Sequence, residues 1–393
     1  MARTYTILRE AGRPRTASPF DLAAPRALAA EGVDLALVDV AELGKAELAD
    51  VARDPQVRAV APVMPTTLVR PRAGEAPQEA GGATWGVQEV GADTSARTGA
   101  GVLVAVLDTG VEASHPAFAG VELVEEDFSG AGTGDREGHG THVAGTVFGR
   151  DVEGTRIGVA PGVQRALIGK ILGDDGSGES DMVFRGIQWA VSEGAQVVSM
   201  SIGFDFPGLV AQLVADGWPT DLATSAALEA YRGNLRMFDA LMAVVRARSA
   251  FGTGAIVVAA AGNESQRDVD PSYEIAAALP AAAEGVVSVG ALARSPEGLV
   301  VAPFSNTFPQ VSAPGVDVLS AALGGGLVSL SGTSMATPHV AGVAALWWEQ
   351  VLASPLPATA ATVLAQLVGS ASYAPFAPDV DVADRGVGLV RAP

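Results

Sequence analysis

The stretch Val102–Leu107 reads VLVAVL and is followed at once by Asp108-Thr109-Gly110. A short, valine-rich apolar run that ends in a turn signal predicts a strand covered on both faces. From Trp85 onward, similar runs alternate with helical patterns and Gly-rich turns, which is typical of βαβ units around a parallel sheet. The sequence therefore predicts an α/β fold with a mostly parallel sheet, and we expect its ligands beyond the carboxyl ends of the strands.

Three polar residues lie at the ends of such apolar elements. Asp108 follows the first strand, and His139 opens an Ala/Val helix in the string GHGTHVAG. Ser334 lies in LSGTSMATPH, at the amino end of the apolar helix that comes next. Each has an ordinary interpretation by itself, as a turn residue, a structural histidine or an N-cap. Together they supply the orienting carboxylate, the base and the nucleophile that hydroxyl activation requires.

Four strings carry a resemblance to a known family. They are AVLDTGV around Asp108, GHGTHVAGT around His139, SGTSMATPHVAG around Ser334 and VVAAAGNE around Asn263. From residue 85 to about 350, the chain resembles the subtilisin-like serine proteases (subtilases, peptidase S8). The order Asp, His, Ser along the chain is the order in subtilisin. The resemblance implies a three-layer α/β sandwich and a serine endopeptidase that works through an acyl-enzyme intermediate.

The resemblance also implies a role for each matched residue. Asp108, His139 and Ser334 would form the catalytic triad, in which His139 takes the hydroxyl proton and Asp108 fixes the imidazole tautomer. The Asn263 amide, with the backbone N–H of Ser334, would stabilise the charge that develops on the carbonyl oxygen. His139 is chosen as the base by its place in the motif. The other histidines are interpreted as structural: His115, His142 and His339.

Two glycine-containing segments resemble the substrate-binding edges of the family. Ile171–Gly178 (ILGDDGSG) matches the loop that pairs with an extended substrate backbone, and Val197–Gly203 (VVSMSIG) matches the strand that faces it. The residues assigned to substrate binding are Gly176, Ser177, Gly178, Ser201, Ile202 and Gly203. An ordinary flexible turn remains the alternative interpretation of both segments.

Residues 1–69 are predicted to form a separate small unit. Strands are predicted at Thr4–Arg9, Leu35–Val40 and Val57–Val63, with helices at Phe20–Ala30 and Lys45–Arg53. The string ARDPQVRAVAPVM near the end of this unit resembles the propeptide of the family. That resemblance implies a ferredoxin-like α+β prodomain that inhibits the enzyme and assists its folding.

Residues 70–84 are predicted to be a linker between this unit and a catalytic domain at 85–393. The string RPRAGEAPQEAGGA is rich in Gly, Pro, Ala and charge and has no periodicity. If the first unit is a propeptide, Pro65–Arg70 would lie in the active cleft as a product-like strand. We therefore expect a self-processing zymogen that is cut somewhere between Leu68 and Ala83.

The chain departs from the usual family pattern at two places. About 50 residues separate Gly203 from Ala255, and Asp221–Ser249 has helical periodicity. We predict an inserted helix or helical pair near the cleft, which either shapes specificity or only covers the surface. The loop Glu264–Leu279 is also long and would border the first specificity pocket.

Composition limits the partners of this 393-residue chain. Hydrophobic residues make up 48%, which is enough for a large core, and the net charge of −19 argues against nucleic acid or an anionic membrane as a partner. The expected partners are polypeptide substrates and the prodomain itself. No apolar run reaches the roughly 20 residues of a membrane span. The start MARTYTILRE lacks the apolar core of a signal peptide, which predicts a cytoplasmic protein, or a secreted one if a signal has been removed.

No metal site is assigned from the sequence. The chain has no cysteine, which excludes disulfides and thiolate chemistry. Many family members bind calcium where this chain has Gly149–Gly154, but that stretch offers two carboxylates beside Arg150, and Ca²⁺ takes about 6–8 oxygen ligands. We interpret it as a solvated charged loop and expect no required cofactor. A structural calcium ion stays open as the alternative, without support from this stretch of sequence.

The pattern has three rival interpretations. Sedolisin-type peptidases carry Glu at the place of His139, and α/β-hydrolase esterases need G-x-S-x-G, whereas Ser334 lies in GTSMA. The third rival is a catalytically silent binding protein, held inhibited by a persistent prodomain. A complete set of catalytic residues argues against it.

Overall fold

The central sheet of the protein carries the predicted strand. The computed structural model describes residues 2–10, 36–75, 81–249 and 254–393. Eight strands form the sheet, in the order β16-β15-β14-β12-β7-β10-β8, with β17 paired to β15. Every pairing is parallel except that of β15 with β16. The strands are β7 (Val104–Asp108), β8 (Glu122–Asp127), β10 (Arg165–Lys170), β12 (Val197–Met200), β14 (Ile256–Ala260), β15 (Val286–Ser295), β16 (Gly298–Val301) and β17 (Val311–Pro314). The prediction of a mostly parallel α/β fold is confirmed.

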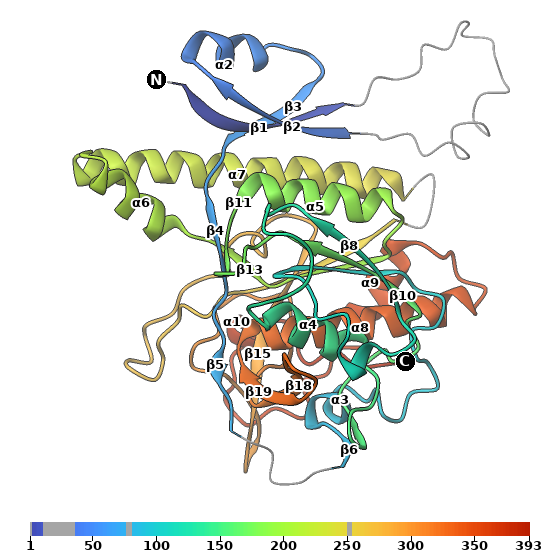
Figure 1. The fold of residues 1–393 in the computed structure, drawn as a ribbon. Helices are drawn as coiled ribbons and strands as arrows, with labels where there is room; N and C mark the ends of the chain where they lie inside the picture. The colour runs from blue at the N-terminus through green and yellow to red at the C-terminus, as the bar shows by residue number, and fades with distance from the viewer. Residues whose placement is uncertain (1, 11–35, 76–80, 250–253) are drawn as a thin grey trace, which may run out of the picture.

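Helices cover both faces of this sheet, so the domain has three layers (Figure 1). Successive side chains of a strand point to opposite faces. In β7, Val104 and Val106 enter the core that contains α4 and α8, whereas Ala105 and Leu107 enter the core that contains α5 and α7. The helices are α3 (Trp85–Glu89), α4 (His139–Phe148), α5 (Ser180–Ser192), α7 (Thr220–Arg248), α8 (Thr333–Leu352), α9 (Ala360–Gly369) and α10 (Val382–Arg385), with a 3₁₀ turn at Pro116–Phe118.

The described part of the N-terminal unit is a small antiparallel sheet with one helix. Its strand order is β2-β1-β3, and its elements are β1 (Arg3–Glu10), β2 (Ala36–Leu43), α2 (Lys45–Val51) and β3 (Val57–Pro62). The predicted strands and second helix are therefore present, with bounds shifted by a few residues. The predicted helix Phe20–Ala30 lies outside the described residues, and a ferredoxin-like prodomain stays a prediction.

The N-terminal unit lies on two helices of the larger domain, α5 and α7 (Figure 1). Two side chains bind its main chain. The Gln188 Oε1 atom accepts a hydrogen bond from Val38 N at 2.8 Å, and the buried Asn234 donates from Nδ2 to the carbonyl of Pro62 at 2.8 Å. Since backbone groups of the unit are satisfied by these helices, its position over the larger domain is defined by specific contacts.

The inserted region between 203 and 255 contains a helical pair, α6 (Phe206–Ala215) and α7. Helix α7 contacts β3 of the N-terminal unit, and α6 contacts the segment β4 (Pro65–Leu68). Leu209 and Leu213 of α6 help to line a cavity of about 850 Å³ beside that segment. The insertion therefore does more than cover the surface, because it supports the N-terminal unit and borders the cleft.

Short strands connect the two parts of the chain. Three small sheets have the orders β11-β4-β13, β18-β19-β5 and β6-β9. Their remaining members are β5 (Arg72–Ala73), β6 (Gly82–Ala83), β9 (Thr155–Arg156), β11 (Ser177–Glu179), β13 (Ile202–Phe204), β18 (Val318–Ala321) and β19 (Leu327–Ser331). Two pieces of the predicted linker thus pair with the larger domain. Composition did not reveal this, because pairing uses main-chain groups that almost any residue offers.

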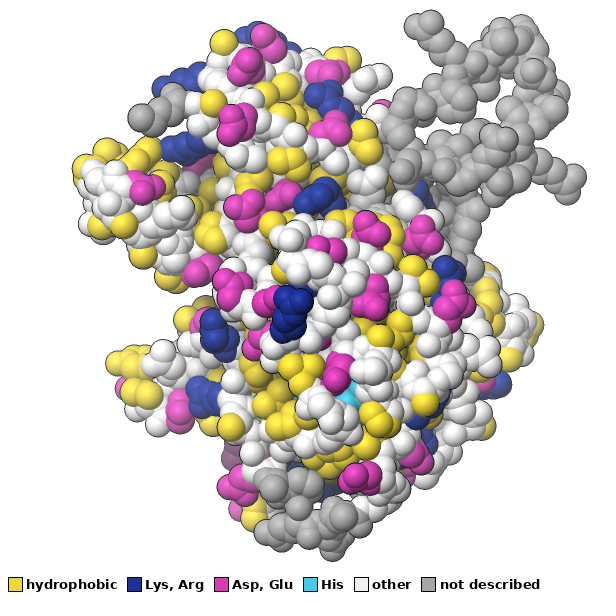
Figure 2. Space-filling view, viewed as in Figure 1, with side chains coloured by type: hydrophobic (Ala, Val, Ile, Leu, Met, Phe, Trp, Pro, Cys, Tyr) yellow, Lys and Arg dark blue, Asp and Glu magenta, His cyan; other side chains and the backbone are white. Residues whose placement is uncertain are grey.

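Acidic side chains are spread over the face shown in Figure 2 and do not gather in one patch. This distribution agrees with the net charge of −19. Among the described residues, no helix is both long and apolar enough to cross a membrane.

Candidate active site

Asp108 and His139 are brought together by strand β7 and helix α4. Asp108 is the last residue of β7, and His139 is the first residue of α4. The His139 Nδ1 atom donates to Asp108 Oδ1 at 2.7 Å, and both side chains are buried. The backbone N–H of Thr109 donates to the same carboxylate oxygen at 2.8 Å. The carboxylate thereby holds the imidazole with Nδ1 protonated and Nε2 free to act as a base.

The electrostatic surroundings of His139 favour its charged form. Burial, the largest influence, disfavours the imidazolium. The charge and hydrogen bond of Asp108, together with the charges of Glu137 and Asp135, outweigh burial and raise the pKa of His139 above its usual value. A base with a raised pKa accepts a proton more readily.

Ser334 lies at the start of a long helix, α8. It is the second residue of α8 and is fully buried in this structure. Its Oγ atom donates to the carbonyl oxygen of Val69 at 3.1 Å. The Nε2 atom of His139 has no hydrogen-bond partner among the described residues. The serine hydroxyl is therefore engaged by the chain's own N-terminal segment.

Asn263 follows β14 and meets the same segment. Its Nδ2 atom donates to the carbonyl of Arg70 at 3.2 Å. Its Oδ1 atom accepts from both the backbone N–H and the hydroxyl of Thr333, each at 2.9 Å. A Cβ atom on Gly332 would lie 3.0 Å from the Nδ2 atom, so this close approach favours glycine there. The amide is thus oriented by the residues that precede Ser334.

The two predicted substrate-binding edges enclose β4 from both sides. On one side, Ser177 pairs with Thr67, and Gly176 accepts from the N–H of Leu68 at 2.8 Å. On the other side, Gly203 pairs with Thr67 as well. The remaining assigned residues also lie here: Gly178 pairs with Thr66, Ile202 pairs with Leu68, and the Ser201 hydroxyl donates to the Ser334 carbonyl at 3.3 Å. Four of the six assigned residues therefore pair with β4 in two antiparallel ladders, Gly176 bonds its main chain, and Ser201 contacts Ser334 instead.

Beyond Ser334 the same segment continues without a break. Arg72 pairs with Ser331 in β19, and its guanidinium lies 3.5 Å from Asp268 in the long loop after Asn263. Residues 65–73 therefore run past Ser334, from β4 between β11 and β13 to β5 beside β19 (Figure 1). Along this path, Ser334 bonds the carbonyl of Val69 and Asn263 bonds the next carbonyl, that of Arg70.

The other three histidines have their own partners. His142 Nε2 contacts the Val318 carbonyl at 3.0 Å, His339 Nδ1 contacts the Met335 carbonyl at 2.8 Å, and His115 Nε2 contacts the Gly326 carbonyl at 2.8 Å. Burial is the main cause that lowers the pKa of His142 to about 3 and that of His339 to about 4. Both imidazoles are therefore neutral over the pH range in which His139 changes charge.

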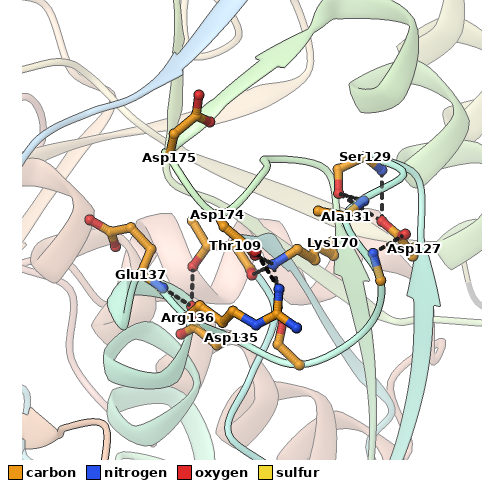
Figure 3. A network of polar contacts seen from close by, with 12 residues as sticks. Thr109, Asp127, Ser129, Ala131, Asp135, Arg136, Glu137, Lys170, Asp174 and Asp175 are labelled. Carbon is orange, nitrogen blue, oxygen red and sulfur yellow. Dashed lines mark hydrogen bonds and ion pairs between the residues drawn. The ribbon is translucent and has the colours of Figure 1, made fainter.

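A polar network surrounds Thr109, the residue after Asp108, and its members Asp135 and Lys170 were not predicted as site residues (Figure 3). Asp135 and Lys170 are almost fully buried, at 9% and 2% exposed. The Lys170 ammonium donates to the carbonyls of Thr109 and Gly134 at 2.7 and 3.0 Å, and to Asp174 Oδ1 at 2.8 Å. The available signal was a lysine at the end of the apolar run RALIGK, since a charge that ends a buried strand needs buried partners.

No group of three or more His, Asp or Glu side chains that could hold a metal ion was found among the described residues. In the predicted charged loop near Gly149, the Arg150 guanidinium donates a hydrogen bond to the Val163 carbonyl at 2.9 Å.

Comparison with known proteins identifies the family. A model of the subtilase family matches residues 99–388. The chain is 34% identical over 314 residues to the thermostable alkaline protease of Halalkalibacterium halodurans. The aligned residues cover 78% of this chain and 71% of that protein. The chain is 35% identical to the intracellular serine protease of Paenibacillus polymyxa, covering 63% and 67%, and 35% identical to subtilisin BL of Lederbergia lenta, covering 67% and 82%.

Three observations indicate the same family. They are the parallel α/β fold, the Asp–His pair at a strand end and the family match over most of the chain. The chain belongs to the subtilase family. It is a subtilisin-like serine endopeptidase, a hydrolase, and members of this family need no organic cofactor. The predicted resemblance is therefore confirmed.

Proposed function

We propose that this endopeptidase cleaves polypeptides with Ser334 as nucleophile, His139 as general base and Asp108 as the carboxylate that orients the base. The 2.7 Å contact between His139 Nδ1 and Asp108 Oδ1 carries the proposal, because it leaves Nε2, which has no hydrogen-bond partner among the described residues, free to accept a proton. His139 takes the hydroxyl proton as Oγ attacks the scissile carbonyl carbon, and then gives that proton to the leaving amine. Water repeats the sequence on the acyl-enzyme and releases the new carboxylate.

Negative charge develops on the carbonyl oxygen during attack, so a preorganised donor is needed beside it. Asn263 is suited to this role because Thr333 fixes its amide through two hydrogen bonds to Oδ1, which leaves Nδ2 as a directed donor. The N–H of Ser334, at the start of α8, supplies the second donor. Substrates bind as extended strands between the edges at 176–178 and 201–203, as β4 does within this chain.

Changing Glu137 to Gln is expected to move the acid limb of the pH profile of kcat/KM to lower pH. The Glu137 carboxylate favours the imidazolium and so raises the pKa of His139, whereas an amide has no such charge. Activity falls as His139 becomes protonated, so a lower pKa keeps the base competent at lower pH. The exposed Glu193, changed to Gln, is the matched control and should leave the profile unchanged. An acid limb that stays in place, or moves up, would contradict the assignment of His139.

The chain is proposed to be a self-processing zymogen in which residues 65–73 block the site. Acyl transfer requires the nucleophile and the oxyanion donor to act on one carbonyl. Here Ser334 bonds the oxygen of Val69 while Asn263 bonds that of Arg70, so the intact segment is not seated for attack. Pairing on both sides of the nucleophile holds the segment in this position. Cleavage between Leu68 and Ala83 then follows only after the segment shifts.

A fluorophosphonate probe tests both parts of this proposal on the full chain. The probe reacts only with an activated serine, so intact chain should label slowly and processed chain rapidly, with the label on Ser334. Peptide hydrolysis should rise in step with labelling. A processed chain that stays unlabelled would instead support a catalytically silent binding protein, and an intact chain that labels as fast as the processed one would contradict the block.

Changing Pro71 to Ala is expected to speed processing several-fold. The proline ring fixes its own φ and restricts Arg70 to extended conformations. Without the ring, the Val69 carbonyl gains freedom to reach Asn263. The half-life of the full-length band and the mass of the new termini measure the effect. Pro55→Ala, in an exposed turn of the N-terminal unit, is the control. Equal half-lives for the Pro71 variant and the unaltered chain would rule out a role for this ring.

A further inference from the structure

We propose that Asp135 is a positioning residue for the reaction and that it acts through the hydroxyl of Thr109 on the placement of Asp108 relative to His139. The inference rests on the proposed triad, and it concerns a residue that contacts neither substrate nor the reacting atoms. Asp135 lies in the loop before α4, four residues ahead of His139, and is 9% exposed.

Five hydrogen bonds converge on this one carboxylate. Its Oδ1 atom accepts from the Thr109 hydroxyl at 3.0 Å and from the N–H groups of Glu137 and Gly138 at 3.1 and 2.9 Å. Its Oδ2 atom accepts from the N–H and the hydroxyl of Thr141 at 2.9 and 2.7 Å. An ionised carboxylate offers about four acceptor sites on two oxygens, and such charge-assisted bonds are among the stronger ones in proteins. The carboxylate therefore holds the loop and the first turn of α4 rigidly.

The Thr109 hydroxyl links the two halves of the catalytic pair. It gives its single hydrogen to Asp135, so a lone pair remains for the N–H of Gly140, which donates to it at 2.9 Å. Thr109 comes directly after Asp108, and Gly140 comes directly after His139. One hydroxyl, oriented by Asp135, thus joins the neighbours of both catalytic residues.

Lys170 fixes the other side of Thr109 (Figure 3). Its ammonium donates to the Thr109 carbonyl at 2.7 Å, while the Thr109 N–H donates to Asp108 Oδ1 at 2.8 Å. Thr109 is therefore held by hydrogen bonds at its carbonyl, its side-chain hydroxyl and its N–H. Asp108 has little freedom to turn away from the imidazole, and preorganisation of this kind is what a catalytic contact needs.

The negative charge of Asp135 also acts on His139, in addition to its hydrogen bonds. The charged or titratable groups that face His139 are Asp108 from β7, Asp135 and Glu137 from the loop before α4, and His142 from α4 itself. His142 is neutral, since its pKa is about 3. Asp135 is thus one of three carboxylates that stabilise the imidazolium formed during attack.

The Asp135→Asn variant tests the inference at 25 °C, with rates expressed per active site titrated by a fluorophosphonate. An amide has one acceptor oxygen and directs its NH₂ group at incoming donors, so several of the five bonds are lost. We expect kcat to fall at least tenfold with little change in KM, because the effect is on the transition state and not on substrate binding. We also expect the acid limb to move to lower pH, because one carboxylate that raises the pKa of His139 is gone.

Two variants of Thr109 separate geometry from charge. Thr109→Val removes the linking hydroxyl but keeps the Asp135 charge, so kcat should fall while the acid limb moves less than in Asp135→Asn. Thr109→Ser keeps the hydroxyl and should retain most of kcat. If Asp135→Asn does not fold, the Thr109 pair still decides the question, and equal kcat values for Val and Ser would overturn the inference.

Asp127→Asn is the matched control. Asp127 is the last residue of β8 and caps the loop that follows it, with bonds from the N–H groups of Ser129 and Gly132 at 2.9 and 2.7 Å, and no bond joins its side chain to Thr109 or His139. It should lower the melting temperature without changing kcat or the acid limb. If it lowers kcat as much as Asp135→Asn, or if Asp135→Asn changes only the melting temperature, the positioning role is wrong. The proposed triad fails separately, if Ser334→Ala keeps its activity.

Discussion

The Ser334→Ala chain is expected to remain a single full-length species and to lose peptide hydrolysis by about 10⁶-fold in kcat. That magnitude was measured for the nucleophile of subtilisin, a member of the same family, and is carried over to this chain. The physical reason is that an alanine offers no oxygen to attack the carbonyl, so His139 and Asp108 have no proton to move. Intact mass and steady-state hydrolysis of a peptide substrate measure the two effects.

Ser312→Ala is a suitable control for this change. Ser312 is also fully buried, and its hydroxyl donates to the Arg385 carbonyl at 3.0 Å and not to a residue of the proposed triad. The control should lose some stability but keep processing and hydrolysis. If Ser334→Ala is still processed at the normal rate, self-cleavage is wrong. If it still hydrolyses peptides at the normal rate, Ser334 is not the nucleophile.

Asn263→Ala is expected to lower kcat by about 10²–10³-fold with a small change in KM. This range was also measured for the oxyanion-hole asparagine of subtilisin itself. The loss follows because the amide donor acts on charge that exists only in the transition state, so ground-state binding changes little. Rates per titrated active site are the appropriate measurement.

Asn263→Asp separates the role of the Nδ2 donor from that of the Oδ1 acceptor, which bonds Thr333. The aspartate keeps an acceptor oxygen for Thr333, whose N–H and hydroxyl bond Asn263 Oδ1 at 2.9 Å, but it replaces the Nδ2 donor by a negative oxygen. If the amide donates to the oxyanion, this variant should be at least as impaired as Asn263→Ala. Restored activity in Asn263→Asp would show that the contact with Thr333 matters and that the donor does not.

Much of the larger domain was predictable because its buried strands leave a strong pattern. The run Val102–Leu107 predicted a doubly covered strand, and β7 occupies Val104–Asp108 with its side chains divided between two cores. By contrast, β5 at Arg72–Ala73 lies inside a stretch that resembles a linker. Its pairing with β19 uses main-chain N–H and C=O groups, which leave no mark in the side-chain pattern.

The candidate site shows the same division. The strings around Asp108, His139, Ser334 and Asn263 named the candidates, since each carries the functional group for one step. Asp135 and Lys170 were missed, because a buried charge is recognised by the donors and acceptors around it. The partners that tie these charges to the site come from segments distant in sequence. The Thr109 hydroxyl is 26 residues from Asp135, and the Lys170 ammonium bonds a carbonyl 61 residues away.

The sequence by itself determined the parallel α/β architecture, the family and the identity of the candidate triad, because apolar periodicity and local strings are properties of neighbouring residues. Only the tertiary structure decided what lies in the cleft and in which register. The Ser334 hydroxyl bonds the carbonyl of Val69, 265 residues away, and Asn263 bonds the next carbonyl, 193 residues away. Which of two successive carbonyls meets which donor depends on strand pairing on both sides of Ser334, because a one-residue change of register would bring a different carbonyl to each donor.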